Sequence, residues 1–234
     1  MNRLEEATQL PVVLTCNLRR EYRNGPSPIV ALANATCLVR RGQQIALMGP
    51  SGSGKSTLVH LLAGIDTPTS GTITWPALSD EPHLRPGPIG VVFQSASLLP
   101  PLTVIENVAL PLLLGGATEI EATRSAHEAL ALLELDSLAS KLPEELSGGQ
   151  AQRVAIARVL AGDPKLILAD EPTGQLDFET ATHVIDVLVA AADASGAALL
   201  INTHDPLIAE RFAIRWSIHD GILSATTDRI ATPC

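Results

Sequence analysis

Aromatic residues are scarce in this chain, which limits how its core can be built. They make up 3% of the 234 residues, whereas hydrophobic residues of all kinds make up 46%. The core must therefore consist of Leu, Val, Ile and Ala, as is typical of buried parallel strands flanked by helices. The chain is long enough for one large domain or two small ones. Together these features favour an α/β protein.

Positive charge is also in deficit, and long uncharged apolar runs are missing. The formal net charge is −9, and this argues against a nucleic-acid partner because neutralising phosphates needs clustered Lys and Arg. The longest apolar run, residues 184–201, contains Asp186, Asp193 and Gly196, so it falls short of the roughly 18 uncharged residues of a spanning helix. The acidic sequence MNRLEEATQL does not resemble a signal peptide. We therefore expect a cytoplasmic location without a membrane span of the chain's own.

The hydrophobic pattern changes along the chain from strands to helices and back. Short β-type runs separated by polar turns fill residues 12–47, which predicts antiparallel strands. Residues 95–161 have a helical period, and TVIE and TEIE are capping boxes that open two helices there. We expect one domain over residues 10–234, with the helical subdomain inserted in its core. We also expect a surface loop in the proline-rich stretch 76–88 and a hairpin around Asp220.

The sequence GPSGSGKST matches the pattern G-x-x-x-x-G-K-[ST] of phosphate-binding loops. It lies between a predicted strand and a predicted helix, which is the context that the pattern requires. Glycines let successive N–H groups face the phosphates, and the helix N-terminus adds its positive end. Lys55 is expected to reach the β- and γ-phosphates, and the Ser56 hydroxyl to bind Mg²⁺. The predicted nucleotide-binding residues of this loop are Gly49, Pro50, Ser51, Gly52, Ser53, Gly54, Lys55, Ser56 and Thr57.

Two acidic residues follow the apolar strand sequence LILA. The carboxyl ends of strands are where open α/β sheets bind ligands. Asp170 is therefore expected to hold Mg²⁺, and Glu171 to orient or deprotonate an attacking water. Acids at a strand end can also be plain helix caps, a reading that weakens beside the phosphate-binding loop.

The stretch LSGGQAQRVAIARVL begins with a second glycine-rich turn. Ser147 and Gln150 form an S-x-x-Q capping box, which explains the start of a helix without any ligand. Capping does not require Gly148 and Gly149, however, and glycine lowers helix propensity by about 1 kcal/mol. Their presence indicates that a ligand approaches the backbone closely, and a second phosphate contact is the natural interpretation.

The order of these motifs, with ILADEPTGQLD and NTHD after LSGGQ, resembles the nucleotide-binding subunits of ABC transporters over almost the whole chain. The resemblance implies an α/β fold with a RecA-like P-loop NTPase core, an antiparallel β-subdomain and an inserted α-helical subdomain. It also implies ATP and Mg²⁺ as cofactors and an integral membrane permease as partner. In that family, the LSGGQ turn of one subunit contacts the γ-phosphate of ATP held by the other. By resemblance, the chain forms a homodimer in its closed ATP state, with Ser147, Gly148, Gly149 and Gln150 acting in trans.

Two polar residues at predicted strand ends gain roles from the same resemblance. Gln94 matches a glutamine that meets Mg²⁺ and the attacking water, although a polar strand end would also account for it. His204 matches a histidine that contacts the γ-phosphate, where the alternative is an ordinary surface or core histidine. The expected catalytic residues are Lys55, Gln94, Glu171 and His204. The expected metal ligands are Ser56, Gln94 and Asp170.

Two positions further from the phosphates complete the expected site. Tyr22, the only tyrosine of the chain, matches the aromatic ring that stacks on adenine in the family, although a lone tyrosine most often serves packing. Asp177 matches an aspartate through which the two subunits communicate. The preceding Gln175 stands where the family more often has another residue.

The sequence SLLPPLTVIENVALPLLL resembles the permease-docking segment of the lipoprotein-releasing and macrolide-exporting group. This resemblance implies export, or extraction of a lipoprotein, lipid or peptide, by a peripheral subunit on the cytoplasmic face of the membrane. An alternative is a regulatory ATPase of the FtsE type, which transmits force through a membrane partner without moving cargo. A soluble ABC ATPase of DNA repair or translation is a third reading. That class usually has tandem cassettes or zinc-binding cysteine clusters, and this sequence has neither.

Overall fold

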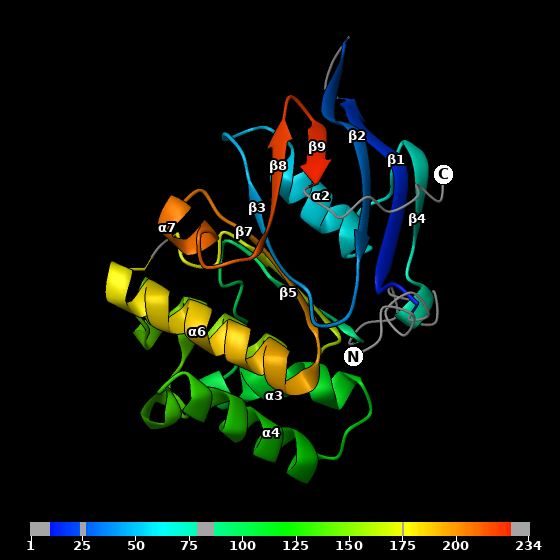
Figure 1. Ribbon diagram of the computed structural model, residues 1–234. Helices are drawn as coiled ribbons and strands as arrows, with labels where there is room; N and C mark the ends of the chain where they lie inside the picture. The colour runs from blue at the N-terminus through cyan, green and yellow to red at the C-terminus, as the bar shows by residue number, and fades with distance from the viewer. Residues whose placement is uncertain (1–9, 24–26, 79–86, 175, 226–234) are drawn as a thin grey trace, which may run out of the picture.

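The computed structural model describes residues 10–23, 27–78, 87–174 and 176–225 (Figure 1). The strands of these residues form one nine-stranded sheet in the order β4-β1-β2-β9-β8-β3-β7-β6-β5. Because neighbours in the sheet are far apart in the chain, the sheet brings together segments from the whole length of the described sequence.

Parallel strands form the part of the sheet that carries the polar strand ends. They are β3 (Gln44–Met48), β5 (Ile89–Val92), β6 (Leu166–Asp170), β7 (Ala198–Asn202) and β8 (Ile214–His219), with β7 between β3 and β6. Every residue of β6 and β7 is buried, as expected for parallel strands covered on both faces. The carboxyl ends of these strands therefore meet at one edge, where ligands bind in sheets of this kind.

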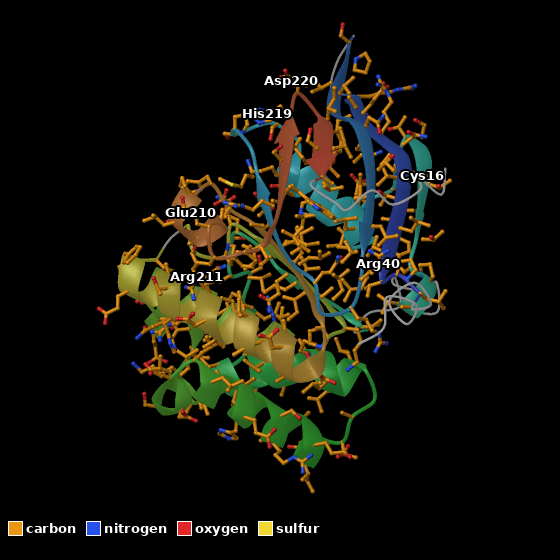
Figure 2. All side chains as sticks on the ribbon, viewed as in Figure 1. Cys16, Arg40, Glu210, Arg211, His219 and Asp220 are labelled. Carbon is orange, nitrogen blue, oxygen red and sulfur yellow. The ribbon has the colours of Figure 1, made fainter. Side chains whose placement is uncertain are left out.

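Antiparallel strands extend the sheet on the other side. β1 (Val13–Arg23) pairs with β2 (Pro28–Val39) and with β4 (Ser70–Thr74), and β9 (Ile222–Ala225) pairs with β8. The predicted hairpin between β8 and β9 is confirmed. Asp220 and Gly221 both have positive φ, 49° and 74°, as two-residue hairpin turns of type I′ require. His219 and Asp220 lie at its tip (Figure 2).

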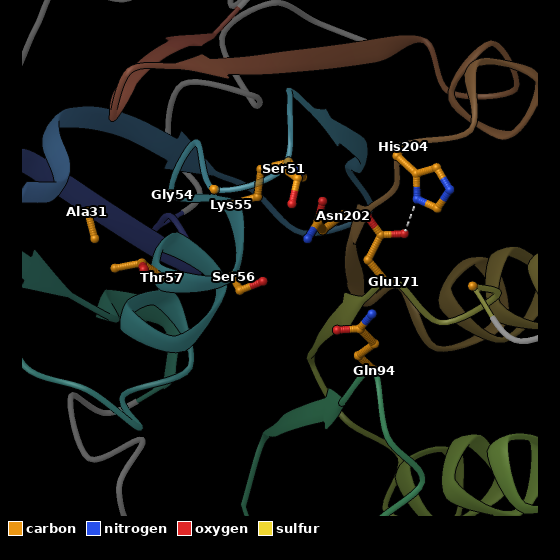
Figure 3. Close-up of a pocket in the computed structure, with 12 residues that line it drawn as sticks. Ala31, Ser51, Gly54, Lys55, Ser56, Thr57, Gln94, Glu171, Asn202 and His204 are labelled. Carbon is orange, nitrogen blue, oxygen red and sulfur yellow. Dashed lines mark hydrogen bonds and ion pairs between the residues drawn. The ribbon is translucent and has the colours of Figure 1, made fainter.

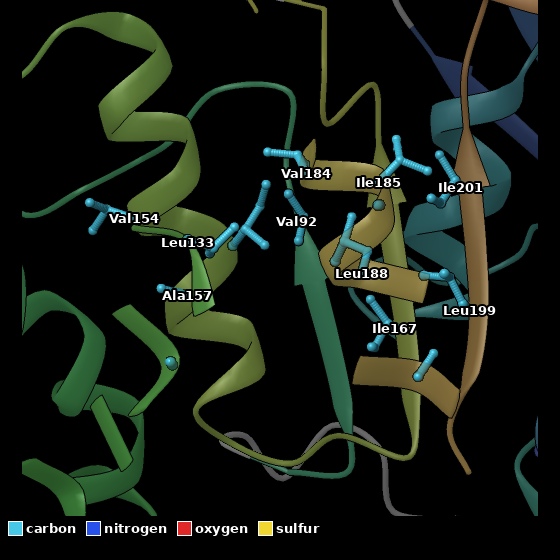
Figure 4. Close-up of a cluster of buried hydrophobic side chains, with 14 of the residues drawn as sticks. Val92, Leu133, Val154, Ala157, Ile167, Val184, Ile185, Leu188, Leu199 and Ile201 are labelled. Atoms are coloured by element: carbon cyan, nitrogen blue, oxygen red, sulfur yellow. The ribbon is translucent and has the colours of Figure 1, made fainter. Parts of the chain in front are cut away.

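Helices cover the sheet and create two aliphatic cores. α2 (Lys55–Leu62) packs in a core with residues of β1, β2 and β3, whereas α6 (Phe178–Ser195) packs in the other. In this second core, side chains of α6 face those of β6 and β7 (Figure 4). Its central residues are Ile167, Val184, Ile185, Leu188, Leu199 and Ile201. Branched aliphatic side chains fill most of this layer, and the aromatic Phe212 belongs to the same core.

The segment between β5 and β6 is mostly helical. It contains α3 (Val104–Leu114), α4 (Glu119–Leu132) and α5 (Gly148–Leu160), with short 3₁₀ turns η2 (Asp136–Leu138) and η3 (Pro143–Glu145). Both predicted capping boxes are present: Thr103 pairs with Glu106, and Thr118 with Glu121. These reciprocal hydrogen bonds satisfy N–H groups that have no partner inside the helix, so the sequence signal corresponds directly to the two helix starts.

Two short elements complete the fold: α7 (Pro206–Ala209) and the 3₁₀ turn η1 (Pro76–Leu78). The expectation of an irregular loop from residue 76 onward is wrong for η1, because Leu78 is buried and its N–H donates to the carbonyl of Trp75. Residues 79–86 of that stretch lie outside the described residues. Among the helices that the structure describes, none combines the length and the apolar character needed to cross a bilayer.

Candidate functional site

A cavity of about 400 Å³ opens at the edge of the sheet where the parallel strands end (Figure 3). It brings together parts of the phosphate-binding loop with residues that follow β5, β6 and β7. The predicted residues that line it are Ser51, Gly52, Gly54, Lys55, Ser56, Thr57, Gln94, Glu171 and His204. Ala31, Gly174 and Asn202 also line it and were not predicted. Five segments that are distant in sequence thus line one cavity.

The glycine-rich loop owes its shape to glycine at two positions. A Cβ on Gly54, at φ 107°, would lie 2.2 Å from the carbonyl oxygen of Ala31, and one on Gly49 would lie 2.3 Å from that of Ile218. No side chain caps the N-terminus of α2 after Gly54. The free N–H groups and the helix dipole therefore make this end of α2 suitable for an anion.

Lys55 is held by the loop that precedes it. Its Nζ donates to the carbonyl oxygens of Gly49, at 2.9 Å, and Pro50, at 3.0 Å, and the residue is 8% exposed. A nearly buried ammonium beside open N–H groups concentrates positive charge in the cavity. This charge suits the phosphates that the loop pattern predicts.

Ser56 and Asp170 form the link between α2 and the end of β6. The Ser56 hydroxyl donates to Asp170 Oδ1 at 3.0 Å, and Asp170 is 6% exposed. The same Oδ1 accepts a hydrogen bond from the side-chain amide of Asn202. Asn202 was not predicted from the sequence, although an amide at the end of the apolar run ALLI was a usable signal.

Glu171 has an unusual backbone conformation and a direct side-chain partner. Its φ is 49°, in the left-handed region that costs a residue with a Cβ about 1–2 kcal/mol. Its N–H donates to the carbonyl of Asn202 at 3.0 Å, and its Oε2 lies 2.6 Å from His204 Nδ1. Strained residues persist where the surroundings fix them, and they cluster at functional sites.

The segment around Gln94 is fastened to α5 by two side chains, Gln152 and Arg158. The Gln152 amide donates to the carbonyl of Phe93 at 3.0 Å. The Arg158 guanidinium donates to the carbonyls of Ala96 and Ser97 at 3.0 and 3.1 Å, and burial lowers its pKa. The segment that carries Gln94 is therefore tied to the helix that begins with the second glycine-rich turn.

The second glycine-rich turn does not contribute to the cavity of its own chain. Ser147 accepts a hydrogen bond from Gln150 N and donates its own N–H to Gln150 Oε1, so the predicted capping box is present. Ser147 and Gly148 are exposed. None of the residues Ser147, Gly148, Gly149 and Gln150 lines the cavity, so the turn presents its groups elsewhere on the surface.

Tyr22, on β1, does not line the cavity, and its side chain is held by two neighbours. The hydroxyl donates to Asp66 Oδ2 at 2.8 Å, and the Arg20 guanidinium carbon lies 4.6 Å from the ring centroid. Arg20 also pairs with Asp66. Burial raises the pKa of Asp66, yet the hydrogen bonds from Tyr22 and Thr67 and the charge of Arg20 outweigh it and leave this pKa below its usual value.

Asp177 caps α6 and likewise lies away from the cavity lining. Its Oδ1 accepts from Thr180 N at 2.9 Å, which lowers the pKa of Asp177. Gln175 lies outside the described residues. The other predicted residues that do not line the cavity are Gly49, Pro50, Ser53 and Asp170.

Comparison with known proteins agrees with this arrangement. Residues 32–174 match the model of the ABC transporter family. The chain is 40% identical to the lipoprotein-releasing system ATP-binding protein LolD of Nitrobacter hamburgensis over 222 residues, which cover 92% of this chain and 96% of that protein. The LolD of Legionella pneumophila strain Paris is 42% identical over the same length, covering 92% and 98%.

Solved structures show the same fold. A dimeric post-hydrolysis state of the ATP-binding cassette MJ0796 bound to ADP and Pi matches with a TM-score of 0.83 and 36% identity, over 92% of this chain and 99% of that one. A dimeric structure of MJ0796, described as a bacterial ABC transporter cassette, matches with a TM-score of 0.84, 36% identity and the same coverage. The predicted P-loop α/β fold is confirmed, and the chain belongs to the ABC transporter family as an ATP-binding subunit that hydrolyses ATP.

Proposed function

We propose that the cavity binds ATP together with Mg²⁺, and that two copies of the chain close on the nucleotide to drive a membrane permease that releases lipoproteins. One observation carries the catalytic part of this proposal. Lys55, Gln94, Glu171 and His204 share a single cavity with the N-terminus of α2. This set combines anion binding with a carboxylate that can serve a hydrolytic water.

The residues present fit a magnesium ion that the nucleotide helps to hold. Within the described residues, no group of three His, Cys, Asp or Glu side chains is arranged to hold a metal alone. Mg²⁺ commonly needs only one or two carboxylates, because phosphate oxygens and waters supply its other ligands. Ser56 and Asp170, joined at 3.0 Å, and Gln94 would hold it. When bound, the ion neutralises charge on the β- and γ-phosphates.

Hydrolysis requires a water in line with the γ-phosphate. Glu171 accepts a proton from this water as its oxygen attacks the γ-phosphorus, and the bond to the bridging oxygen breaks to release ADP. His204 holds the Glu171 carboxylate through its Nδ1. Lys55 and the N–H groups of the loop stabilise the negative charge on the transferred phosphoryl group.

A second copy of the chain completes each site. The LSGGQ turn lies outside the cavity of its own chain, with Ser147 exposed. In a head-to-tail dimer with twofold symmetry, this turn faces the cavity of the other copy and supplies further N–H and hydroxyl donors. The dimeric state of the two MJ0796 structures supports this arrangement.

The proposed partner of the dimer is a membrane permease, which ATP hydrolysis drives. Both curated relatives are named as ATP-binding proteins of a lipoprotein-releasing system, which supports lipoprotein release as the function and a peripheral position on the cytoplasmic face of the membrane. The C-terminal end of α3 exposes Leu113 and Leu114, at 42% and 71%, and this apolar end suits a permease contact. An FtsE-like regulatory function is not favoured, because the relatives at 40–42% identity are LolD proteins.

The substitution Glu171→Gln tests the catalytic assignment. It preserves the shape of the side chain but removes the proton acceptor, so we expect ATP binding to persist while the turnover rate falls by about 10²–10⁴-fold. ATP should then accumulate in stable dimers, which sedimentation velocity detects. Glu128→Gln on the exposed face of α4 is the matched control. Hydrolysis by Glu171→Gln at the parental rate would show that Glu171 is not the base.

Reconstitution with the native permease tests the transport assignment. In proteoliposomes that contain the permease and a lipoprotein, we expect ATP to drive release of the lipoprotein. Continued ATP hydrolysis without any release would instead favour a regulatory role.

A further inference from the structure

Asn202 is a buried amide at the end of an otherwise apolar strand. It closes β7, whose other residues, Ala198 to Ile201, are completely buried hydrophobic residues. Asn202 itself is 1% exposed, yet it lines the nucleotide cavity (Figure 3). A strand that is buried on both faces favours an aliphatic side chain at such a position. The presence of a polar amide at this buried position is therefore best explained by its contact with the cavity.

The hydrogen bonds fix which way the amide points. Its Nδ2 donates to Asp170 Oδ1, which also accepts from the Ser56 hydroxyl. The opposite orientation would place two oxygen acceptors against each other, so the amide nitrogen must face Asp170. The carbonyl oxygen Oδ1 is then the free end, and it is buried without a hydrogen-bond partner. A buried acceptor of this kind is uncommon and costs free energy unless a ligand or water satisfies it.

The chemistry of the cavity limits what can satisfy this oxygen. Phosphate oxygens are acceptors, so the triphosphate cannot donate to Asn202 Oδ1. Two donor positions of Lys55 already serve Gly49 and Pro50. The proposed cation, held by Ser56 and Asp170, brings waters whose protons are strong donors, since Mg²⁺ usually keeps several waters.

We propose that Asn202 is a positioning residue for the magnesium ion, with its amide nitrogen orienting Asp170 and its carbonyl oxygen accepting from a water of the ion's hydration shell. This inference rests on the proposed function. Asn202 joins both acidic residues of the site, because its backbone carbonyl also accepts from Glu171 N at 3.0 Å. It belongs to the outer shell of contacts that orient metal ligands, whose loss typically weakens metal binding by about 10–100-fold.

The test compares metal-dependent and metal-independent nucleotide binding in Asn202→Val. Calorimetry measures the Kd of a non-hydrolysable ATP analogue in Mg²⁺ and in EDTA, and electron paramagnetic resonance measures Mn²⁺ binding with the analogue present. We expect Mn²⁺ affinity to fall by about 10–100-fold, while the Kd in EDTA stays at the wild-type value. The control Thr203→Val removes the neighbouring buried hydroxyl, which does not line the cavity, and should leave both values unchanged.

Thermal unfolding without nucleotide measures the structural role of Asn202. Asn202→Val removes the unpartnered acceptor, but it also removes the hydrogen bond that Asn202 Nδ2 donates to the buried Asp170 carboxylate. These two losses act on the melting temperature in opposite directions, so the Mn²⁺ affinity is the deciding measurement. If Asn202→Val binds Mn²⁺ with the wild-type affinity, the proposal is overturned. This holds whether its melting temperature falls or stays at the wild-type value. If Asn202→Val does not fold, Asn202→Ser is measured in the same way, because the shorter serine side chain also lacks the amide group. If the wild-type protein binds the ATP analogue with the same Kd in Mg²⁺ and in EDTA, this result would instead contradict the proposed function.

Discussion

His204 Nδ1 lies 2.6 Å from Glu171 Oε2, so the residues that follow β7 and β6 meet directly at the cavity. The two side chains differ in environment: that of His204 is 71% exposed and that of Glu171 only 16%. The exposed imidazole of His204 therefore contacts a Glu171 carboxylate that is itself largely buried. Glu171 has few ways to turn, because its backbone is also fixed by the hydrogen bond to Asn202.

Removing this imidazole should affect turnover more than binding. We expect His204→Ala to lower kcat by about 10²-fold or more, because the proton acceptor is no longer held in position, while the Kd for ATP changes little. Steady-state ATPase assays and nucleotide titrations measure the two effects. His219→Ala, at the exposed tip of the β8–β9 hairpin, should match the wild type. An equal loss of affinity and rate in His204→Ala would argue that the residue only binds nucleotide.

Tyr22 should report adenine binding by itself, because the chain has a single tyrosine. With 3-fluorotyrosine incorporated, we expect one ¹⁹F resonance that shifts on addition of ATP but not of tripolyphosphate. Tyr22→Ala should weaken ATP binding by roughly 10–100-fold, in line with about 1–3 kcal/mol for stacking on one base. Tyr22→Phe keeps the ring and loses only the bond to Asp66, so its loss should be much smaller. Identical shifts with ATP and tripolyphosphate would remove Tyr22 from the adenine site.

Short motifs in the sequence correctly predicted those structural features that are determined by a few neighbouring residues. The phosphate-binding loop and the three capping boxes, at Thr103, Thr118 and Ser147, are encoded by spacing within nine residues or fewer, and the structure contains all of them. The hairpin at Asp220 belongs to the same class.

Contacts between distant segments could not be predicted from the sequence in this way. Asn202 meets Asp170 only because β6 and β7 are adjacent and in register. Arg158 reaches Ala96 and Ser97 only because α5 packs beside the loop after β5. Periodicity places each residue on its own element, but it contains no information on which elements become neighbours.

The glycines of the phosphate-binding loop should differ in their tolerance of a methyl group. Gly54→Ala would place its Cβ 2.2 Å from the Ala31 carbonyl oxygen, whereas nothing lies within 4 Å of a Cβ on Gly52. Both have positive φ, at 107° and 76°, but only the Cβ of Gly54→Ala also clashes with the backbone. We expect Gly54→Ala to lose ATP binding and to lower the melting temperature more than Gly52→Ala does. Equal effects would mean that the loop relaxes around the clash.

Arg158 should control the order of the loop that carries Gln94. Arg158→Met keeps the apolar stem but removes both bonds to Ala96 and Ser97. Because Ser97 is exposed and Ala96 only partly covered, water can replace the lost donors and the loop is released from α5. We expect faster amide hydrogen exchange in residues 93–97 and a lower ATPase rate in a folded protein. Arg124→Met on α4, where the side chain is 72% exposed, is the control. Unchanged exchange would show that Gln152 alone holds the loop.

On the proposed function, one chain carries halves of two different sites, and only a pair of chains completes them. Lys55→Ala damages the phosphate-binding loop, and Ser147→Arg blocks the LSGGQ turn, so each variant alone should be inactive. Their heterodimer has one site in which both halves are intact. ATPase activity of a one-to-one mixture should therefore recover to about a quarter of the wild-type rate, because half of the dimers are mixed and each has one working site of two. A mixture that stays as inactive as either variant alone would show that the two glycine-rich turns do not form a shared site.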